Sequence, residues 1–592
     1  MVAPSPPRPF RPALFRWGAA LASALALGAA LTAGAAEWPL RGPQTLQAIA
    51  RQVEAAYGLE VEVTGPAGLR LLPRPLVELG AVAFRTRDGT VRIDAERLRG
   101  SLDLTALATG EVRLAHVWLG RPTVTVDADR LKSQVAPMLH GEPARLAGLM
   151  RTAGLSLRDG VVRVQSANPA ADLLLTDVSG SFSWPTLGAG ASLTGSATWR
   201  GTALTGSLDL DSPDALLAGG GSLASFHLRS EPIDLQGIVT LSGSGDSRAV
   251  GRIAATTRDL AGFLRLIQHP APQLGGFSRA HLDGTVAATD ETLSISDATV
   301  GLGDMQFEGA LAVRRKGDRP ALAATLATDR IDIGRFLDQL PAVADPDGPW
   351  TSRPLDTLAI ADDAIDLRVS AAHATLGRLV IEDSSLSLQS GDGRLEMSLG
   401  EARAYDGLVK ARVVAAVEGG ATVARLDAAL SRIDLGKLLK DAGAPVGSGI
   451  LTGHLGIESR GASPDALARA AQGRGELTLR DGTLDLPALT AATRNGDAAP
   501  TRVTDLAATF DDAVVRFGVR RGAISLVDSG VTWPQARAEL SGSASLPERR
   551  LDLKAVVTPD TDGDPVAFGI AGPWRDLQLS PVRASSPPRP PS

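Results

Sequence analysis

Apolar and polar residues alternate along most of this chain. Leu59, Val61 and Val63 alternate with glutamates, and the same period of two returns in residues 91–93 and 124–126. A period of two places the apolar side chains on one face of a β-strand and the polar ones on the other. Because the alternation continues almost to the carboxyl terminus, it predicts many half-buried strands.

Asp-Gly dipeptides recur between these alternating runs. They lie at residues 88–89, 159–160, 392–393 and 481–482. Asp-Gly suits the positive φ angles of a tight hairpin turn. The sequence therefore predicts that strands on either side of each dipeptide pair with one another in a long antiparallel meander.

A short helical pattern repeats after some of the strands. Residues 328–337 resemble residues 431–439 in order and type, and residues 257–264 are a weaker copy. Each copy follows a strand pattern and opens an apolar helix, which predicts short helices near Leu260, Gly334 and Gly436. Such a repeat indicates units of several strands closed by one short helix.

A further helix is predicted from Pro464 to Gln472. Ser463 is a good N-cap residue, and proline fits the first helical position. Gly473 is predicted to end the helix at the C′ position, where a positive φ favours glycine.

The amino terminus predicts a membrane segment. Residues 1–16 carry Arg8, Arg11 and Arg16 without an acidic residue, and Trp17 to Ala36 is an uncharged run of 20 residues. That length spans a bilayer, and the arginines place its amino end in the cytoplasm. Residues 32–36 also fit a small-residue cleavage site, so a retained anchor and a cleaved signal peptide both remain open.

A helix with one apolar face is predicted from Thr45 to Tyr57. Its apolar residues recur at helical spacing, and its polar face carries one Arg and one Glu. The helix either packs on the first strands or lies on a membrane surface, and the absence of a basic stripe favours packing.

Composition narrows the functional classes. The chain has 592 residues, with 60 Lys and Arg against 66 Asp and Glu, so it has no basic excess and no nucleic-acid partner is predicted. It has no cysteine, which excludes disulfides and thiolate metal sites. Its seven histidines are scattered, and no nucleophile or phosphate-loop motif is convincing. We therefore expect a protein that is not an enzyme and that has no cofactor or metal.

Two regions of the chain resemble the AsmA family of Gram-negative envelope proteins. In the first region, roughly residues 10–130, a membrane segment precedes the Thr45 helix, residues 69–73 and the strand patterns of residues 77–86 and 112–124. In the second, roughly residues 360–580, the similarity lies in four short segments, which are residues 453–463, 472–482, 542–553 and 570–574.

The resemblance implies an architecture and a role. The fold class that we expect is mainly β (α+β), an elongated curved antiparallel sheet that forms a groove of repeated strand units, with short capping helices and one amino-terminal transmembrane helix. The family implies a bacterial inner-membrane protein with its body in the periplasm. It also implies a role in outer-membrane biogenesis, by transfer of phospholipid or by regulation of protein targeting and assembly at the outer membrane. The partners implied are membrane phospholipids, the inner membrane and envelope-assembly proteins.

The resemblance and the patterns together give a domain organisation. After the cytoplasmic residues 1–16 and the anchor or signal peptide 17–36, the remaining segments follow in order. They are an AsmA-like amino-terminal module (37–130), a middle β-repeat region (131–345), a linker (346–358), an AsmA-like carboxyl-terminal module (359–580) and a proline-rich disordered tail (581–592).

The candidate lipid-contacting residues are alternating apolar residues of the second region. They are Leu455, Ile457, Leu477, Leu479, Leu484 and Leu486. The alternation alone fits a groove lining or a closed sandwich core, and favours the core. The family resemblance shifts this balance toward a groove. The alternative function is a secreted β-solenoid or adhesin-like stalk that does not carry lipid.

Overall fold

The computed structural model describes residues 36, 38–39, 59–72, 74–86, 88–102, 114–130, 154–167, 172–185, 188–243, 248–268, 274, 276–316, 319–338, 342–344, 348–355, 364–442, 447–484, 509–560, 565–574 and 577–582. These residues divide into two compact units, residues 1–256 (unit 1) and residues 257–592 (unit 2). Most of them lie in β-strands, so the prediction of a mainly β fold is confirmed.

Unit 1 is a sheet, and its described residues include the short helix α6. Its elements are β1 (Trp38–Pro39), β2 (Leu59–Val63), β3 (Ala67–Arg70), β4 (Leu76–Thr86), β5 (Val91–Leu102), β6 (Leu114–Asp127), β7 (Leu155–Gln165), β8 (Leu173–Ser183), β9 (Ala191–Trp199), β10 (Thr202–Leu210), α6 (Pro213–Leu217), β11 (Gly221–Ser230), β12 (Asp234–Ser242) and β13 (Ala249–Thr257).

Unit 2 is a longer sheet with four short helices among its described residues. Its elements are α7 (Leu260–Leu266), β14 (Ala280–Ala288), β15 (Thr292–Leu302), β16 (Met305–Lys316), β17 (Arg319–Asp332), α8 (Ile333–Leu337), β18 (Ala364–Leu376), β19 (Leu379–Gly391), β20 (Arg394–Ala404), β21 (Gly407–Glu418), β22 (Ala421–Asp434), α10 (Leu435–Ala442), β23 (Gly447–Gly461), α11 (Pro464–Ala470), β24 (Gln472–Leu484), β25 (Thr509–Arg520), β26 (Ala523–Trp533), β27 (Ala536–Ser545), β28 (Arg550–Pro559), β29 (Val566–Pro573) and β30 (Gln578–Val582).

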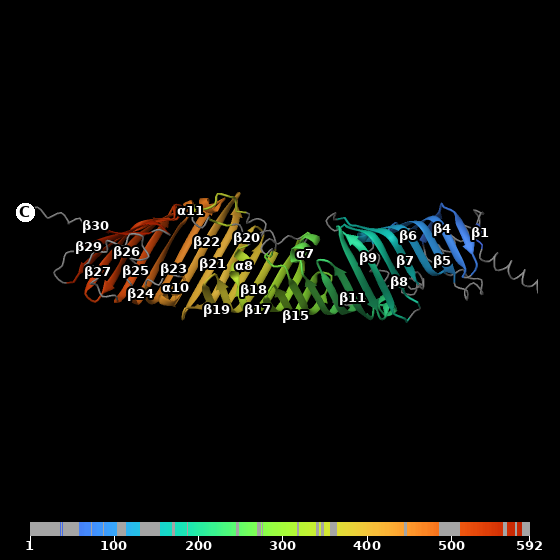
Figure 1. Cartoon of the computed structure of the whole chain (residues 1–592), viewed down its shortest axis with the longest axis horizontal. Coiled ribbons are helices and arrows are strands. Elements are labelled where there is room, and N and C mark those ends of the chain that lie inside the picture. The colour runs from blue at the N-terminus through green and yellow to red at the C-terminus, as the bar shows by residue number, and fades with distance from the viewer. Residues whose placement is uncertain are drawn as a thin grey trace, which may run out of the picture. The chain divides into compact units, whose positions relative to one another are not determined.

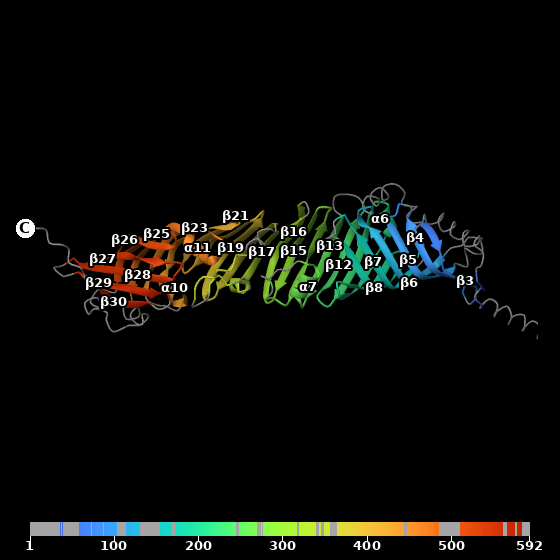
Figure 2. The ribbon, with the colours of Figure 1, turned by 90° about the horizontal axis from the view of Figure 1, so that it is seen from above.

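Neighbours in the chain are mostly neighbours in the sheet. From β4 through β13, and again from β14 through β30, each strand pairs with the next, and Figures 1 and 2 show the strands of each unit following one another in chain order. The pairs are antiparallel except β6 with β7 and β17 with β18, which are parallel. The expectation of a wholly antiparallel sheet is therefore wrong, and the sheets are mixed.

The two parallel pairs follow from long connections. Residues 128–154 join β6 to β7, and residues 333–363 join β17 to β18. A chain that returns to the same end of a sheet needs a crossover of a dozen residues or more, whereas an antiparallel pair needs only a tight turn. Helix α8 begins the second crossover.

Two of the four Asp-Gly dipeptides form the predicted hairpins. Asp88-Gly89 joins β4 to β5, and Asp392-Gly393 joins β19 to β20 with φ angles of 53° and 75°. Asp159-Gly160 and Asp481-Gly482 instead lie inside β7 and β24. The hairpins predicted at these two dipeptides are wrong.

Aspartates with positive φ interrupt several strands. Asp159 and Asp481 have φ angles of 54° and 49°, and Asp177, Asp297 and Asp528 have similar values inside β8, β15 and β26. The pairing register shifts beside Asp159, Asp177, Asp297 and Asp528, as expected for β-bulges. A short polar side chain tolerates the left-handed conformation, so the same residue type serves a turn or a bulge.

The helices near Leu260, Gly334, Gly436 and Pro464 are confirmed as α7, α8, α10 and α11, respectively. Asp259 caps α7 by accepting a hydrogen bond from the Gly262 amide at 2.8 Å. Ser463 caps α11 as predicted, by accepting a hydrogen bond from the Ala466 amide at 3.2 Å. Helix α6 was not predicted from the sequence.

The predicted role of Gly473 is wrong. Helix α11 ends at Ala470, and Gly473 lies in β24 without a positive φ. A Cβ at this position would lie 2.2 Å from the carbonyl oxygen of Gly456 in β23. Glycine is therefore required here by the close approach of two strands rather than by a helix cap.

Residues 348–355, within the predicted linker, are packed against unit 2. The indole Nε1 of Trp350 donates a hydrogen bond to the Leu546 carbonyl at 2.7 Å. The guanidinium of Arg549 lies 5.8 Å from the ring centre of Trp350 and 5.9 Å from that of Trp574. These contacts tie the β17–β18 crossover to the turn after β27.

No helix within the described residues is long and apolar enough to cross a membrane. The predicted span 17–36 lies outside the described residues except for Ala36, and the predicted helix 45–57 lies wholly outside them.

Candidate functional site

Cross-strand pairs place apolar residues of many strands on one face of each sheet. Residues paired directly across neighbouring strands lie on the same face. In unit 1 one such row contains only apolar residues and glycines, and it consists of Ala67, Leu79, Leu98, Leu119, Leu157, Gly180, Gly195, Gly206, Leu228, Leu235 and Ala255. The row beside it is again apolar, from Leu69 in β3 through Phe182 in β8 to Ile253 in β13. We call this side of each sheet the apolar face.

Unit 2 has the same arrangement over more strands. One row on its apolar face consists of Val286, Ile295, Leu311, Ala324, Leu367, Leu388, Met397, Val413, Leu426, Ile457, Gly473, Val519, Ile524, Ala544 and Leu551. The adjacent row contains Val369, Leu399, Leu455 and Phe517. Neither row contains a charged residue.

Four of the six residues predicted from the sequence share this face. Leu455 and Ile457 lie on β23 opposite Gly475 and Gly473 of β24, and Leu477 and Leu479 continue the same parity along β24. Leu484 is the last residue of β24, where it pairs with Gly447, and Leu486 lies outside the described residues. The structure therefore brings Leu455, Ile457, Leu477 and Leu479 together, and their contact with lipid stays a prediction.

Parts of the apolar face remain open to solvent. Met397 is 42% exposed, Leu293 is 43% exposed and Leu193 is 47% exposed, although all three lie in rows of apolar residues. Fully buried strand residues in a closed sandwich would lose nearly all of this exposure. Where it is open, the face presents a continuous apolar surface.

Other parts of the face are covered. In unit 2, helices α7 and α8 pack on the β14–β18 end, where Leu260, Phe277, Phe307 and Ile331 belong to one buried cluster. In unit 1, the β3–β6 section is buried around Val82, Leu98 and Leu119. Some strands of each unit are therefore buried on this face and others are not.

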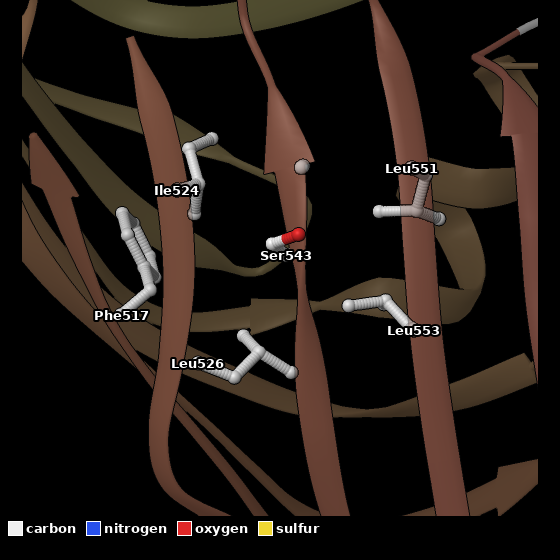
Figure 3. A pocket seen from close by; sticks show the side chains of 7 residues that line it. Phe517, Ile524, Leu526, Ser543, Leu551 and Leu553 are labelled. Carbon is white, nitrogen blue, oxygen red and sulfur yellow. The ribbon is translucent and has the colours of Figure 1, made fainter. Parts of the chain in front are cut away.

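Two pockets lie on the apolar face. In unit 1 the pocket has a volume of about 430 Å³ and is lined by residues of β7–β11, with no Asp, Glu, Lys or Arg among them. In unit 2 the pocket has a volume of about 190 Å³, and Figure 3 shows the side chains of Phe517, Leu526 and Leu553 around it. Neither pocket was predicted from the sequence, because the residues that lie side by side on neighbouring strands depend on the pairing register.

The opposite face of each sheet is charged and paired. In unit 2, Glu396 forms ion pairs with Arg394 at 3.0 Å and Arg412 at 2.7 Å. The hydrogen bonds from Arg412 and Arg394 lower the pKa of the Glu396 carboxyl. In unit 1, Asp234 pairs with His227 at 2.7 Å and Arg229 at 3.0 Å, and the His227 contact is the main cause that lowers the pKa of Asp234. These charged side chains lie on the face of the sheet that contacts water, and the other face remains apolar.

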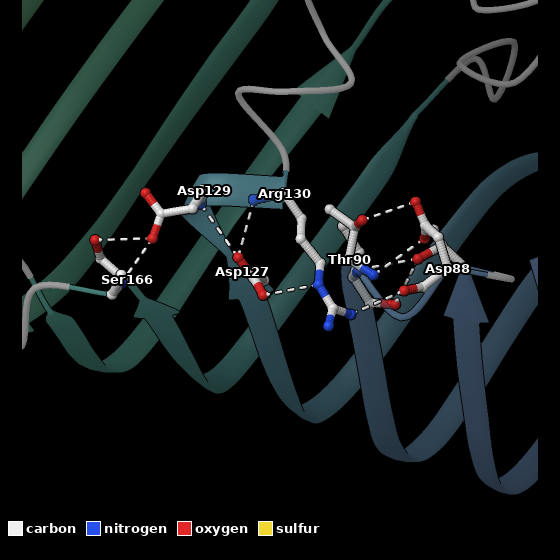
Figure 4. A network of polar contacts seen from close by, with 9 residues as sticks. Asp88, Thr90, Asp127, Asp129, Arg130 and Ser166 are labelled. Carbon is white, nitrogen blue, oxygen red and sulfur yellow. Dashed lines mark hydrogen bonds and ion pairs between the residues drawn. The ribbon is translucent and has the colours of Figure 1, made fainter.

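A polar network fixes the strand ends beside the first crossover (Figure 4). The guanidinium of Arg130 donates to the Asp88 carbonyl at 3.0 Å and pairs with Asp127 at 3.3 Å. The carboxylate of Asp129 accepts a hydrogen bond from the Ser166 hydroxyl at 3.2 Å. The network thus joins the β4–β5 turn to the ends of β6 and β7, and so positions the parallel pair.

Most of the side chains that line the two pockets are apolar or small. Within the part of the chain that the structure describes, no three His, Asp or Glu side chains are placed to hold a metal ion. The lining residues offer dispersion contacts and exclusion of water, which suit a hydrocarbon ligand.

Comparison with known proteins supports the family assignment. Residues 297–532 match the model of the AsmA family, a region that runs from β15 to β26 and contains Leu455, Ile457, Leu477 and Leu479. It starts earlier and ends earlier than the second region of resemblance in the sequence, and it does not include residues 10–130. A search of curated proteins finds no match. The resemblance to the AsmA family is therefore confirmed for residues 297–532.

Proposed function

We propose that this protein binds the acyl chains of membrane phospholipids on its apolar face and carries or holds them during outer-membrane biogenesis. The protein would be anchored in the bacterial inner membrane by residues 17–36, with its body in the periplasm. It would act without catalysis and without a cofactor. An effect on protein targeting or assembly at the outer membrane would follow from its influence on lipid supply.

The observation that carries the proposal is the contrast between the two faces of each sheet. One row without a polar or charged residue crosses every strand from β14 to β28, yet Met397 in this row remains 42% exposed. Exposing such a surface to water costs roughly 25 cal/mol per Å² of apolar area, so a continuous open face gains stability when hydrocarbon covers it.

The family region supports the same interpretation. It covers the strands that carry Leu455, Ile457, Leu477 and Leu479. The resemblance to this family implies a protein of the bacterial envelope. The charged opposite face is suited to an aqueous compartment. Together these features favour a protein that shields hydrocarbon from water on one side only.

Photo-crosslinking tests the proposal directly. A photoreactive residue at position 397 or 477 lies on the apolar face, and one at position 398 or 478 lies on the opposite face of the same strand. In membranes that contain the full chain, positions 397 and 477 should capture phospholipid and positions 398 and 478 should not. Equal capture from both faces, or none at any apolar position of a folded protein, contradicts the proposal and favours the structural-stalk alternative.

The same cells test the compartment. Protease added to spheroplasts should degrade the body of the chain, and the protein should sediment with membranes. A product that resists the protease, or a soluble periplasmic product that begins near Ala36, would contradict the anchored arrangement.

A further inference from the structure

Three glycines pair directly with one another on the apolar face of unit 1. Gly180 in β8 pairs with Gly195 in β9, and Gly195 pairs with Gly206 in β10. All three line the pocket of about 430 Å³. We call this line of three residues the glycine row. At most other positions of this face the residue has a side chain.

Side chains stand on both sides of the glycine row. Phe182, Leu193 and Leu208 pair across β8–β10 on one side. Val178, Ala197 and Leu204 line the pocket on the other side, and Ala197 pairs with Leu204. At its two ends the row continues into Leu157 of β7 and Leu228 of β11. The glycine row is thus the floor of a slot that runs across the strands.

Neighbouring side chains do not fill this slot. The atoms closest to a Cβ built on Gly180 or Gly195 belong to the backbone of the adjacent strand, and the Leu228 side chain lies 3.6 Å from a Cβ at Gly206. The space above the three glycines is therefore part of the open pocket.

The dimensions of the slot limit what it can hold. Residues on the same face of a strand are two positions apart, about 6.8 Å. Each wall is one such spacing from the glycine row, so the gap between the walls has the width of one missing row of side chains. An α-helix is about 10–12 Å across with its side chains, and a second sheet packs at about 10 Å, so neither enters the slot. The walls carry no charge, which excludes an ionic ligand. A single hydrocarbon chain fits both limits.

We propose that the glycine row is a seat for one unbranched acyl chain, which lies perpendicular to β8, β9 and β10. This inference rests on the proposed function and adds a preference for straight-chain lipid at one defined place. Methyl branches would collide with the leucine and phenylalanine walls, whereas a straight chain lies between them.

Gly206→Leu is the variant that blocks the slot. A Cβ at Gly206 meets its nearest atoms at 3.5 Å and 3.6 Å, and the residue has no positive φ, so the strand accepts a side chain there. The matched control is Thr205→Leu, which adds the same side chain to the preceding residue of β10 on the opposite face, where the exposed Thr205 pairs with Ser196 and Arg229 and does not line the pocket. Circular dichroism of both variants checks folding.

The experiment uses the full chain and a phosphatidylethanolamine probe with a diazirine in one straight acyl chain, with labelled peptides mapped by mass spectrometry. Gly206→Leu should lower labelling of β8–β10 roughly tenfold, since overpacking of this size weakens binding by that order. Labelling of the β20–β22 peptides in unit 2 should not change. Thr205→Leu should change neither.

A second measurement does not depend on any variant. With the unaltered protein, an excess of straight-chain phosphatidylethanolamine should reduce β8–β10 labelling several-fold more than an equal excess of methyl-branched phosphatidylethanolamine. Equal competition by the two lipids would overturn the preference for straight chains.

The outcomes separate this inference from the proposed function. Unchanged β8–β10 labelling in folded Gly206→Leu, with labelling of unit 2 retained, overturns the glycine-row seat and leaves the lipid-binding function in place. No labelling of either unit in the unaltered protein overturns both.

Discussion

Two glycines on the apolar face of unit 2 and one on that of unit 1 have different surroundings. In unit 2, a Cβ at Gly475 would lie 2.4 Å from the ring of Phe517, and one at Gly473 would lie 2.2 Å from a carbonyl oxygen. In unit 1, a Cβ at Gly206 has no atom closer than 3.5 Å. The glycines of unit 2 make room for protein atoms, whereas Gly206 leaves room that protein atoms do not use. Similar strand sequences therefore give a closed surface in one place and an open one in another.

A phenylalanine of unit 2 that is covered by helices also differs from a phenylalanine of unit 1 that lines the open pocket. Helices α7 and α8 of unit 2 bury Phe277 to 3% exposure, with its ring 5.2 Å from that of Phe336. Phe226 of unit 1 is only partly buried and lines the open pocket. The difference shows that apolar alternation alone does not determine whether a strand face becomes core or binding surface.

The largest expected effect compares these two phenylalanines. Phe277→Ala should lower the free energy of unfolding by about 3–5 kcal/mol, because it leaves a cavity in a packed cluster. Phe226→Ala should cost about 1–2 kcal/mol, because the ring is already partly in water. Urea denaturation of the full chain, followed by circular dichroism, measures both. Equal losses would mean that the face of unit 1 is packed as tightly as that of unit 2.

A smaller effect compares two glycines. Gly473→Ala should destabilise the protein by about 1–3 kcal/mol, since its new methyl group meets the backbone of β23. Gly206→Ala should leave the stability unchanged or raise it by up to about 1 kcal/mol, because alanine restricts the unfolded chain. The same denaturation curves test this pair. A large loss from Gly206→Ala would contradict the open slot.

The smallest effect concerns acid. The pKa values of Asp234 in unit 1 and Glu396 in unit 2 are lowered from ordinary values of 3.8 and 4.5 by their basic partners. A lowered folded-state pKa stabilises the protein above the ordinary value, and this contribution is lost as the pH falls through the folded-state pKa. The Asp234 side chain is 38% exposed and the Glu396 side chain 20% exposed, and their arginine partners are more exposed still, so the loss should be small and reduced by salt.

Denaturation between about pH 3 and about pH 6 tests this acid dependence, because the ordinary pKa values lie in that interval. Glu396→Gln should make the decrease in the free energy of unfolding at low pH slightly smaller, and added salt should do the same. An identical pH profile for Glu396→Gln would show that the pairs with Arg394 and Arg412 contribute nothing measurable.

Local sequence was sufficient for some parts of the fold. The alternation predicted the strands, and Ser463 with Pro464 predicted the start of α11, because capping depends on a few adjacent residues. The common face of Leu455, Ile457, Leu477 and Leu479 was also predictable, since no bulge interrupts these stretches of β23 and β24.

Other parts depend on distant pairing. Asp392-Gly393 and Asp481-Gly482 have the same local sequence, yet the first is a hairpin turn and the second lies within one strand. What separates them is whether the flanking segments pair with each other or with other strands. The glycine row has the same origin, because it exists only when β8, β9 and β10 adopt one particular register. No single segment contains that information.

The two parallel pairs set an order for folding. The hairpins within each unit form from segments close in the chain, whereas β7 can join β6 only after residues 128–154 have closed a loop, and β18 can join β17 only after residues 333–363 have done so. The hairpins should therefore form first and the parallel joints last. Until then β6, β7, β17 and β18 each present an unpaired edge, which makes these two joints the places where an incompletely folded chain is most prone to aggregate.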